Sequence, residues 1–247
     1  MSEYLETAKE AARAAGAMQR ENFEADLDVN EFTRHDIKLE LDVRCQELIT
    51  DKILAAFPDH AIYGEEGMAG NQESEFQWIV DPIDGTVNFF YGIPHFCVSI
   101  AMRRGDELRV GVIYDPMMDE LYEVERGGRP MRNGKEIGVS KRGKMGDAVV
   151  TVGFSKTEEG MKRGMAKFER YATRVRKTRM MGSAALGMAY VACGRLDGYV
   201  EEQISLWDIA AGQLLVEAAG GKVARSPGAE KSDTWSIVVT NGKISFD

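Results

Sequence analysis

Apolar residues recur at helical spacing near the start of the chain and predict a first helix from Ser2 to about Phe23. The residues on this stripe are mostly small: Leu5, Ala8, Ala12, Ala15 and Met18. Such spacing is typical of a helix with one buried face, and small side chains let a second helix pack closely. Ser2 provides an N-cap oxygen, and acidic residues follow in the first turns.

A second helical pattern begins near Asp42 and ends at Pro58, which cannot continue a helix. Its apolar face consists of Val43, Leu48, Ile49, Ile53, Leu54 and Phe57. The polar residues 25–38 that precede it fit either a loop or a hairpin. A short strand is predicted for residues 60–63, and the acidic turn Gly64-Glu65-Glu66-Gly67 follows it.

The stretch Trp78–Phe90, WIVDPIDGTVNFF, joins a continuous apolar run to an acidic turn. Its first three residues predict a buried strand. Pro82 favours an extended backbone at Asp81 and lacks an N–H group. Asp84 stands where a helix would begin. The sequence therefore predicts a strand, a tight turn and a helix in immediate succession.

The rest of the chain divides into a meander and an alternating segment. Consecutive antiparallel strands are predicted for residues 96–103, 108–114 and 120–124. Beyond them strand and helix alternate, which is typical of a layered α/β domain. The predicted helices are 158–171, 183–193 and 206–219, and the predicted strands are 148–153, 175–180, 196–202, 223 and 237–240. The polar join at 140–146 suggests two halves, 1–140 and 141–247.

Composition and charge narrow the function classes. The 247 residues suffice for one large α/β domain or two that share an interface. A formal net charge of −9 argues against a partner whose phosphate backbone needs a basic face, so we expect no nucleic acid. No run approaches the ~20 apolar residues of a membrane helix. Three widely spaced cysteines and an acidic start without a signal-peptide pattern indicate a cytoplasmic protein.

Candidate chemistry lies in the turn after the buried strand. Asp81 and Asp84 place two carboxylates three residues apart at the end of that strand. Oxygen ligands of this kind suit Mg²⁺. Gly85 and Thr86 open the helix that follows, and the free N–H groups of a helix start suit a phosphate. The combination predicts phosphoryl transfer, although the same residue types also serve as turn residues and helix caps.

Several motifs occur together along the chain. The longer two are WIVDPIDGTVNF at Trp78–Phe89 and WDIAAG at Trp207–Gly212. Three short ones accompany them: Gly64-Glu65-Glu66, Gly182-Ser183-Ala184-Ala185 and Tyr199-Val200-Glu201. With these motifs the sequence resembles, over nearly its full length, the inositol monophosphatase family of Mg²⁺-dependent, lithium-sensitive phosphatases. The resemblance implies the sugar-phosphatase fold, a five-layer α-β-α-β-α sandwich of the α/β class.

The resemblance also implies which residues hold the metal. Glu65, Asp81 and the backbone carbonyl of Ile83 would hold one Mg²⁺. Asp81, Asp84 and Asp208 would hold a second ion. A third and weaker ion would lie near Glu65 with mostly water ligands, which gives two to three ions for each site.

Catalytic and substrate contacts follow from the same resemblance. A water activated by the metal would attack the phosphorus, with Glu65 and the Thr86 hydroxyl orienting it and taking its proton, and Asp84 completes the catalytic set. The amides of Gly85 and Thr86 would bind the phosphate. The remaining substrate contacts would come from Ser183, Ala184, Glu201 and Asp208.

Some side chains have two interpretations. Asp42 matches a family acid near the metal, and it fits a helix cap equally well. Glu66 fits a solvated loop carboxylate better than a ligand, and Glu201 fits either a substrate contact or a surface carboxylate. The three histidines show no ligand spacing and are interpreted as structural or surface residues: His35, His60 and His95.

The expected function is Mg²⁺-dependent hydrolysis of a phosphate monoester, with inositol-1-phosphate or a related polyol phosphate favoured. Relatives with the same ligand set act on fructose-1,6-bisphosphate, 3′-phosphoadenosine 5′-phosphate or histidinol phosphate, and these alternatives stay open. A binding module that keeps the fold without turnover is a further alternative, which the complete ligand set argues against. We expect a homodimer with no membrane partner.

Overall fold

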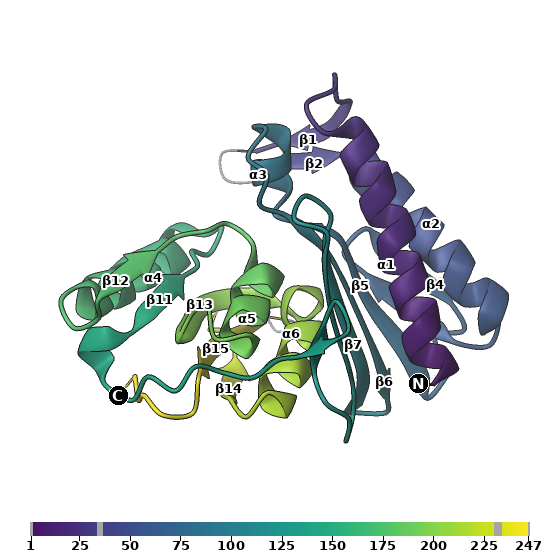
Figure 1. The fold of residues 1–247 in the computed structure, drawn as a ribbon. Helices are drawn as coiled ribbons and strands as arrows, with labels where there is room; N and C mark the ends of the chain where they lie inside the picture. The colour runs from purple at the N-terminus through teal and green to yellow at the C-terminus, as the bar shows by residue number, and fades with distance from the viewer. Residues whose placement is uncertain (1, 34–36, 230–233, 247) are drawn as a thin grey trace.

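The computed structural model describes residues 2–33, 37–229 and 234–246. Within these residues, helices and two large sheets alternate in five layers (Figure 1). Helices α1 and α2 cover the outer face of an eight-stranded sheet, helices α5 and α6 lie between the two sheets, and α4 covers the far face of a five-stranded sheet. This order confirms the predicted α-β-α-β-α sandwich.

The outer helices of the first layer follow the hydrophobic pattern closely. Helix α1 spans Glu3–Asn22 and helix α2 spans Glu40–Ala56. The Ser2 hydroxyl caps α1 by accepting the Leu5 N–H at 3.4 Å, as predicted. Most of the small stripe on α1 is fully buried against the large sheet and α2, so the two helices pack closely.

The large sheet has the strand order β10-β9-β8-β7-β6-β5-β3-β4. The β3–β5 pair is parallel, and the other pairs are antiparallel. The predicted meander is confirmed as β6, β7 and β8. The strand bounds are β3 Ala61–Gly64, β4 Gly67–Gly70, β5 Phe76–Asp84, β6 Cys97–Arg104, β7 Glu107–Asp115, β8 Glu120–Glu125, β9 Met131–Arg132 and β10 Lys135–Glu136.

The small sheet has the order β12-β11-β13-β15-β14 and mixes parallel and antiparallel pairs. Its bounds are β11 Val149–Val152, β12 Lys177–Arg179, β13 Gly198–Ser205, β14 Lys222–Pro227 and β15 Thr234–Thr240. The helices around it are α4 Glu158–Ala172, α5 Ala184–Ala192 and α6 Leu206–Ala218, and a short 3-10 helix lies at Met145–Asp147. The final strand pair is longer than expected, because β14 is a polar edge strand whose exposed residues carry no apolar pattern.

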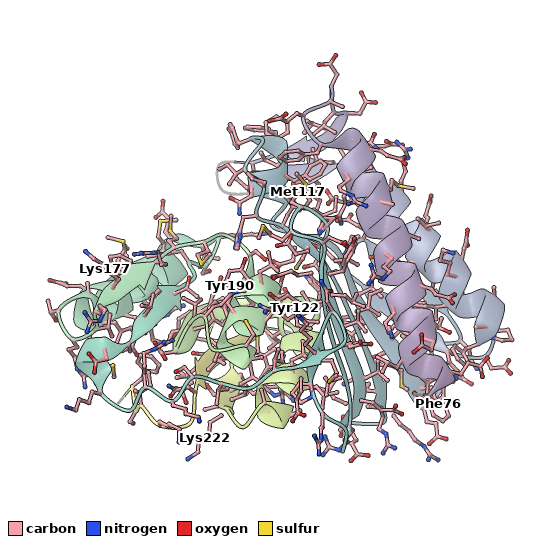
Figure 2. The ribbon with its side chains drawn as sticks, viewed as in Figure 1. Phe76, Met117, Tyr122, Lys177, Tyr190 and Lys222 are labelled. Atoms are coloured by element: carbon pink, nitrogen blue, oxygen red, sulfur yellow. The ribbon has the colours of Figure 1, made fainter. Side chains whose placement is uncertain are left out.

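One apolar core fills the space between the two sheets. Helices α5 and α6 are buried on nearly all sides, which explains their Ala-rich and Gly-containing sequences. Figure 2 shows Tyr122 of β8 beside Tyr190 of α5, where this layer meets the large sheet. Arg195 links the two rings, since it donates to the Tyr122 hydroxyl at 3.0 Å and lies 4.9 Å from the centre of the Tyr190 ring.

A small hairpin lies at the end of the large sheet where β5 turns into α3 (Figure 1). Its strands are β1 Val29–Phe32 and β2 Ile37–Leu39, paired antiparallel. Residues 25–38 therefore contain a hairpin, the second of the two alternatives open from sequence. In the part of the chain that the structure describes, no helix is both long and apolar enough to cross a membrane.

Candidate active site

The acidic turn forms where β5 ends and α3, Thr86–Phe90, begins. The pairing of β5 with β6 shifts register between Asp81 and Asp84, so the intervening residues bulge out of the ladder. Gly85 follows with φ +102°, a conformation that a side chain disfavours. A Cβ at Gly85 would also lie 3.0 Å from the His95 carbonyl oxygen. The predicted strand, turn and helix are confirmed, although α3 has only five residues.

Three carboxylates from two distant motifs meet at this turn. One oxygen each of Asp81, Asp84 and Asp208 lies within 4.8 Å of the others. Asp208 is the third residue of α6, and its Oδ2 accepts the Ser205 N–H at 2.9 Å. The first turn of α6 therefore places this carboxylate beside the end of β5, where the middle helical layer packs on the large sheet.

The electrostatics of this cluster suit a cation. Burial raises the pKa of Asp81, and repulsion from Glu65, Asp84 and Asp208 raises it further. Asp81 is 1% exposed, and its Oδ2 has no hydrogen-bond partner among the residues that the structure describes. A buried, unpartnered oxygen among mutually repelling carboxylates is the donor set that a hard divalent cation satisfies. The residues present therefore fit Mg²⁺.

Glu65 approaches the cluster from the end of the parallel strand β3. Its N–H donates to the Val80 carbonyl at 3.1 Å, so β3 remains in register with β5 as far as the turn. Its charge raises the pKa of Asp81, Asp208 and Asp42. Glu66 instead lies 3.5 Å from the Lys38 ammonium, and its side chain is 10% exposed, so it is an ion-paired carboxylate and not the solvated one that we expected.

Thr86 lies between a carbonyl and a carboxylate. Its hydroxyl donates to the Ile83 carbonyl at 2.9 Å and is 3.4 Å from Asp42 Oδ1. The other oxygen of Asp42 accepts the Leu39 N–H at 2.7 Å, at the start of α2. Burial raises the pKa of Asp42 to about 8. Asp42 therefore caps its helix and also borders the acidic cluster, so both of its interpretations describe its position.

Asp84 is bound by the N-terminus of α5. It accepts the Ser183 hydroxyl at 2.5 Å and the N–H groups of Ala184 and Ala185 at 3.1 and 2.7 Å. The Cys97 thiol lies 3.6 Å away. The donors that we expected to contact substrate, Ser183 and Ala184, are thus directed at a carboxylate of the acidic cluster.

Glu201 lies on β13 near Asp84, whose charge helps raise its pKa. Burial is the main cause and raises the pKa of Glu201 to about 7, while the Tyr199 hydroxyl, which donates to Glu201 at 2.5 Å, acts in the opposite direction. The pairing of β13 with β15 shifts register directly after Glu201. The carboxylate lies directly against Gly153, so a Cβ there would force the Glu201 side chain to move.

Two amide side chains that sequence reasoning missed support the site. Gln46 on α2 accepts the Glu66 N–H at 2.9 Å and donates to the Gly67 carbonyl at 3.1 Å, which fixes the turn after Glu65. Asn88 donates to the carbonyls of His95 and Met181 at 2.8 and 2.9 Å. A neutral amide inside a helix gives no periodic or charge signal, although Asn88 does stand inside the long motif.

Two histidines lie in the described residues, and neither belongs to the cluster of Asp81, Asp84 and Asp208. The His60 Nδ1 accepts the Trp78 indole N–H at 3.1 Å, and His95 packs edge-on against Tyr190. His35 lies outside the described residues. The structural interpretation therefore fits His60 and His95.

The family of this chain follows from its similarity to known proteins. The model described as the inositol monophosphatase family matches residues 1–244. The chain belongs to this family. The inositol-1-monophosphatase of Mesorhizobium japonicum is 41% identical over 206 residues, covering 82% of this chain and 77% of that protein. Nus factor SuhB of Xylella fastidiosa is 38% identical over 224 residues, covering 89% and 81%.

A solved structure agrees with this assignment. The extragenic suppressor protein SuhB of Bartonella henselae matches with a TM-score of 0.90 at 32% identity, covering 98% of this chain and 95% of that chain. The inositol monophosphatase family is a family of phosphatases, so the chain is assigned to the phosphoric ester hydrolases. The names of its relatives differ, and the specific substrate is a separate question.

Proposed function

We propose that this protein is a Mg²⁺-dependent phosphate monoester hydrolase with inositol-1-phosphate or a related polyol phosphate as substrate. The observation that supports the proposal most directly is the convergence of Asp81, Asp84 and Asp208, with one oxygen of each inside a 4.8 Å cluster. The unpartnered oxygen of buried Asp81 adds to it. A non-catalytic binding module would not need this complete set.

The metal would be held by the side chains of Glu65, Asp81, Asp84 and Asp208 and by the Ile83 carbonyl, with two to three ions in each site. Bound Mg²⁺ would supply Lewis-acid stabilisation of the phosphate and its leaving oxygen and would ease deprotonation of water. The chain's own groups have the remaining tasks. Glu65, with the Thr86 hydroxyl, orients the attacking water and takes its proton. Asp42 Oδ1 lies 3.4 Å from that hydroxyl.

Substrate recognition would combine amides with one carboxylate. The N–H groups of Gly85 and Thr86 bind the phosphate, where the helix start favours negative charge. Glu201 accepts hydrogen bonds from substrate hydroxyls, a role consistent with its place near Asp84. Asp208 borders both metal and substrate, and the backbone at Ser183 and Ala184 lies along the same side.

Replacement of Asp84 by Asn tests the proposal. Asp84→Asn removes one charge from the cluster and keeps the shape of the side chain. Its remaining oxygen can replace Oδ2, which accepts the Ser183 hydroxyl and the Ala185 N–H, so the fold should survive loss of the Ala184 bond. We expect Mg²⁺-dependent phosphate release from inositol-1-phosphate to fall at least about a hundredfold. Asp115→Asn is the matched control, because Asp115 is also buried on the large sheet but caps Met117 and Met118 instead. Wild-type turnover in the Asp84→Asn variant would contradict the proposal.

A substrate panel decides between the alternatives. Phosphate release would be compared as kcat/KM for inositol-1-phosphate, fructose-1,6-bisphosphate, 3′-phosphoadenosine 5′-phosphate and histidinol phosphate. The acidic balance of the chain and Glu201 favour a monophosphate, because a second phosphate beside a carboxylate is repelled. Preference for a bisphosphate would contradict this part of the proposal.

Further expectations concern inhibitors and partners. Li⁺ should inhibit turnover by occupying one metal site, and unchanged activity in a Li⁺ titration at limiting Mg²⁺ would count against it. We propose that the protein is a cytoplasmic homodimer without a nucleic-acid partner. Within each chain, the two halves 1–140 and 141–247 would meet at the active site. Sedimentation as a single species of 27.4 kDa would contradict the dimer, and salt-dependent RNA binding would contradict the absence of a nucleic-acid partner.

A further inference from the structure

Helix α1 carries one buried residue that does not fit its small apolar stripe. Gln19 is 0% exposed and lies four residues after Ala15, on the face that packs against the large sheet. An amide in such a position is unfavourable unless it is hydrogen bonded. The position of Gln19 therefore needs an explanation beyond helix packing.

The hydrogen bond of Gln19 reaches the acidic turn from behind. Its Nε2 donates to the Pro82 carbonyl at 2.6 Å. Pro82 lies within the segment where β5 shifts register against β6, between Asp81 and Asp84. Backbone groups in a bulge fall outside the regular ladder, so a side chain from the neighbouring helical layer satisfies this carbonyl.

The carbonyl that Gln19 binds belongs to the peptide plane joining Pro82 to Ile83. That plane is rigid, and its other polar group, the Ile83 N–H, donates to Asp81 Oδ1 at 3.1 Å. Gln19 and Asp81 thus hold the same peptide plane from opposite ends. The next carbonyl, that of Ile83, accepts the Thr86 hydroxyl at 2.9 Å. Rotation of this one plane would displace both Asp81 and the Ile83 carbonyl.

We infer that Gln19 is a positioning residue for the metal-binding turn: it fixes the Pro82–Ile83 peptide so that Asp81 and the Ile83 carbonyl stay aimed at the cation. This inference rests on the proposed metal site. A purely structural role predicts lost stability with normal metal binding by the protein that remains folded. The positioning role predicts weaker metal binding as well.

The test replaces Gln19 by Met, which has a similar length and no donor. Calorimetric titration with Mn²⁺, without substrate, should show a dissociation constant at least about tenfold larger than that of the wild-type protein. This is the usual size of effect for groups that orient metal ligands. With saturating inositol-1-phosphate, the Mg²⁺ concentration for half-maximal phosphate release should rise in parallel, while KM changes little.

Gln213→Met is the matched control. Gln213 and Gln19 each have a buried side-chain oxygen with no hydrogen-bond partner among the described residues, but the Gln213 amide donates to Glu217 on the same helix, at 3.0 Å. This variant should keep the wild-type Mn²⁺ affinity. If Gln19→Met fails to fold, Gln19→Asn gives the second test, because it keeps the amide but shortens the side chain below the reach of Pro82.

Unchanged Mn²⁺ affinity in a folded Gln19 variant would overturn the inference, whatever its loss of thermal stability. Equal weakening in Gln213→Met would also overturn it. Absence of Mn²⁺ binding by the wild-type protein would instead contradict the metal site itself, so the two failures can be distinguished.

Discussion

His60 is a single residue whose protonation should affect stability. Its ring stacks on Phe57 and Phe76 with centroid distances of 4.9 and 4.8 Å. Its Nδ1 accepts the Trp78 indole N–H, which requires an unprotonated Nδ1. Burial lowers the pKa of His60, so the folded protein favours the neutral ring.

The free energy of unfolding should therefore fall in acid. Because the unfolded histidine has the higher pKa, about 6.5, it binds a proton first as the pH drops, and stability declines from that pH through the lower folded pKa. Urea denaturation between pH 7.5 and pH 5, followed by Trp fluorescence, measures the effect. His60→Asn should flatten this decline, and an equal slope in both proteins would contradict the assignment.

Residue chemistry also marks the limit of sequence reasoning at this site. Asp81 and Asp84 were predictable because two carboxylates beside Pro and Gly form a recognisable turn, and Asp208 because its motif is specific. Gln19 and Gln46 were not predictable. A neutral amide has no charge, and on a helix it has the same spacing as the apolar residues around it, so only the three-dimensional contact to the turn identifies it.

At the scale of elements, the start of α5 has two tasks. The Ser183 hydroxyl accepts the Leu186 N–H at 3.3 Å, as an N-cap does, and donates to Asp84. Asn88 holds the preceding loop through the Met181 carbonyl. The helix start is thus tied both to its own backbone and to the acidic cluster.

Two cap variants separate these tasks. Thr157→Ala removes the cap of α4, where the hydroxyl accepts the Gly160 N–H at 3.1 Å and has the Ser155 hydroxyl as its other neighbour, at 3.1 Å. It should cost about 1 kcal/mol in free energy of unfolding and leave the Mg²⁺ requirement unchanged. Ser183→Ala should cost about 2 kcal/mol, because a charge-assisted hydrogen bond is also lost, and should raise the Mg²⁺ requirement. Equal Mg²⁺ requirements in the two variants would contradict the second task.

The elements that sequence predicted well have long apolar stretches, which are periodic in α1 and α2 and nearly continuous in α6. Helices α1, α2 and α6 and the meander of β6, β7 and β8 have long apolar patterns, and their bounds agree within a few residues. The pairs β9–β10 and β1–β2 were missed or left open, because strands of two to four residues at a sheet end or in a hairpin bury too little to carry a pattern.

At the scale of the whole molecule, the join between the two sheets depends on Asp197. This residue is 0% exposed, and it accepts the Arg142 guanidinium at 2.8 Å, the Val149 N–H at 2.8 Å and the Ser140 hydroxyl. Asn241 donates to Ser140 at 2.9 Å and to the Arg142 carbonyl at 2.8 Å. One buried carboxylate therefore ties the linker from the large sheet to the small sheet.

Loss of that carboxylate should destabilise the molecule as a unit. Asp197→Ala leaves several donors unpaired, and we expect a loss of about 3 to 5 kcal/mol in the free energy of unfolding. Asp106→Ala is the control, because Asp106 is fully exposed and lies 4.0 Å from Arg103, and it should change stability little. Urea denaturation followed by circular dichroism measures both. A loss below about 1 kcal/mol for Asp197→Ala would show that the hydrogen bonds of Asp197 contribute little to stability.

Carboxylates from β5 and α6 meet in one cluster, which we propose to be a single cation site. Crystals of the wild-type protein soaked in Mn²⁺, measured at a wavelength with strong Mn anomalous scattering, test it most directly. We expect an anomalous peak bounded by Asp81, Asp84 and Asp208. Absence of a peak there, at a Mn²⁺ concentration that sustains phosphate release in solution, would contradict it.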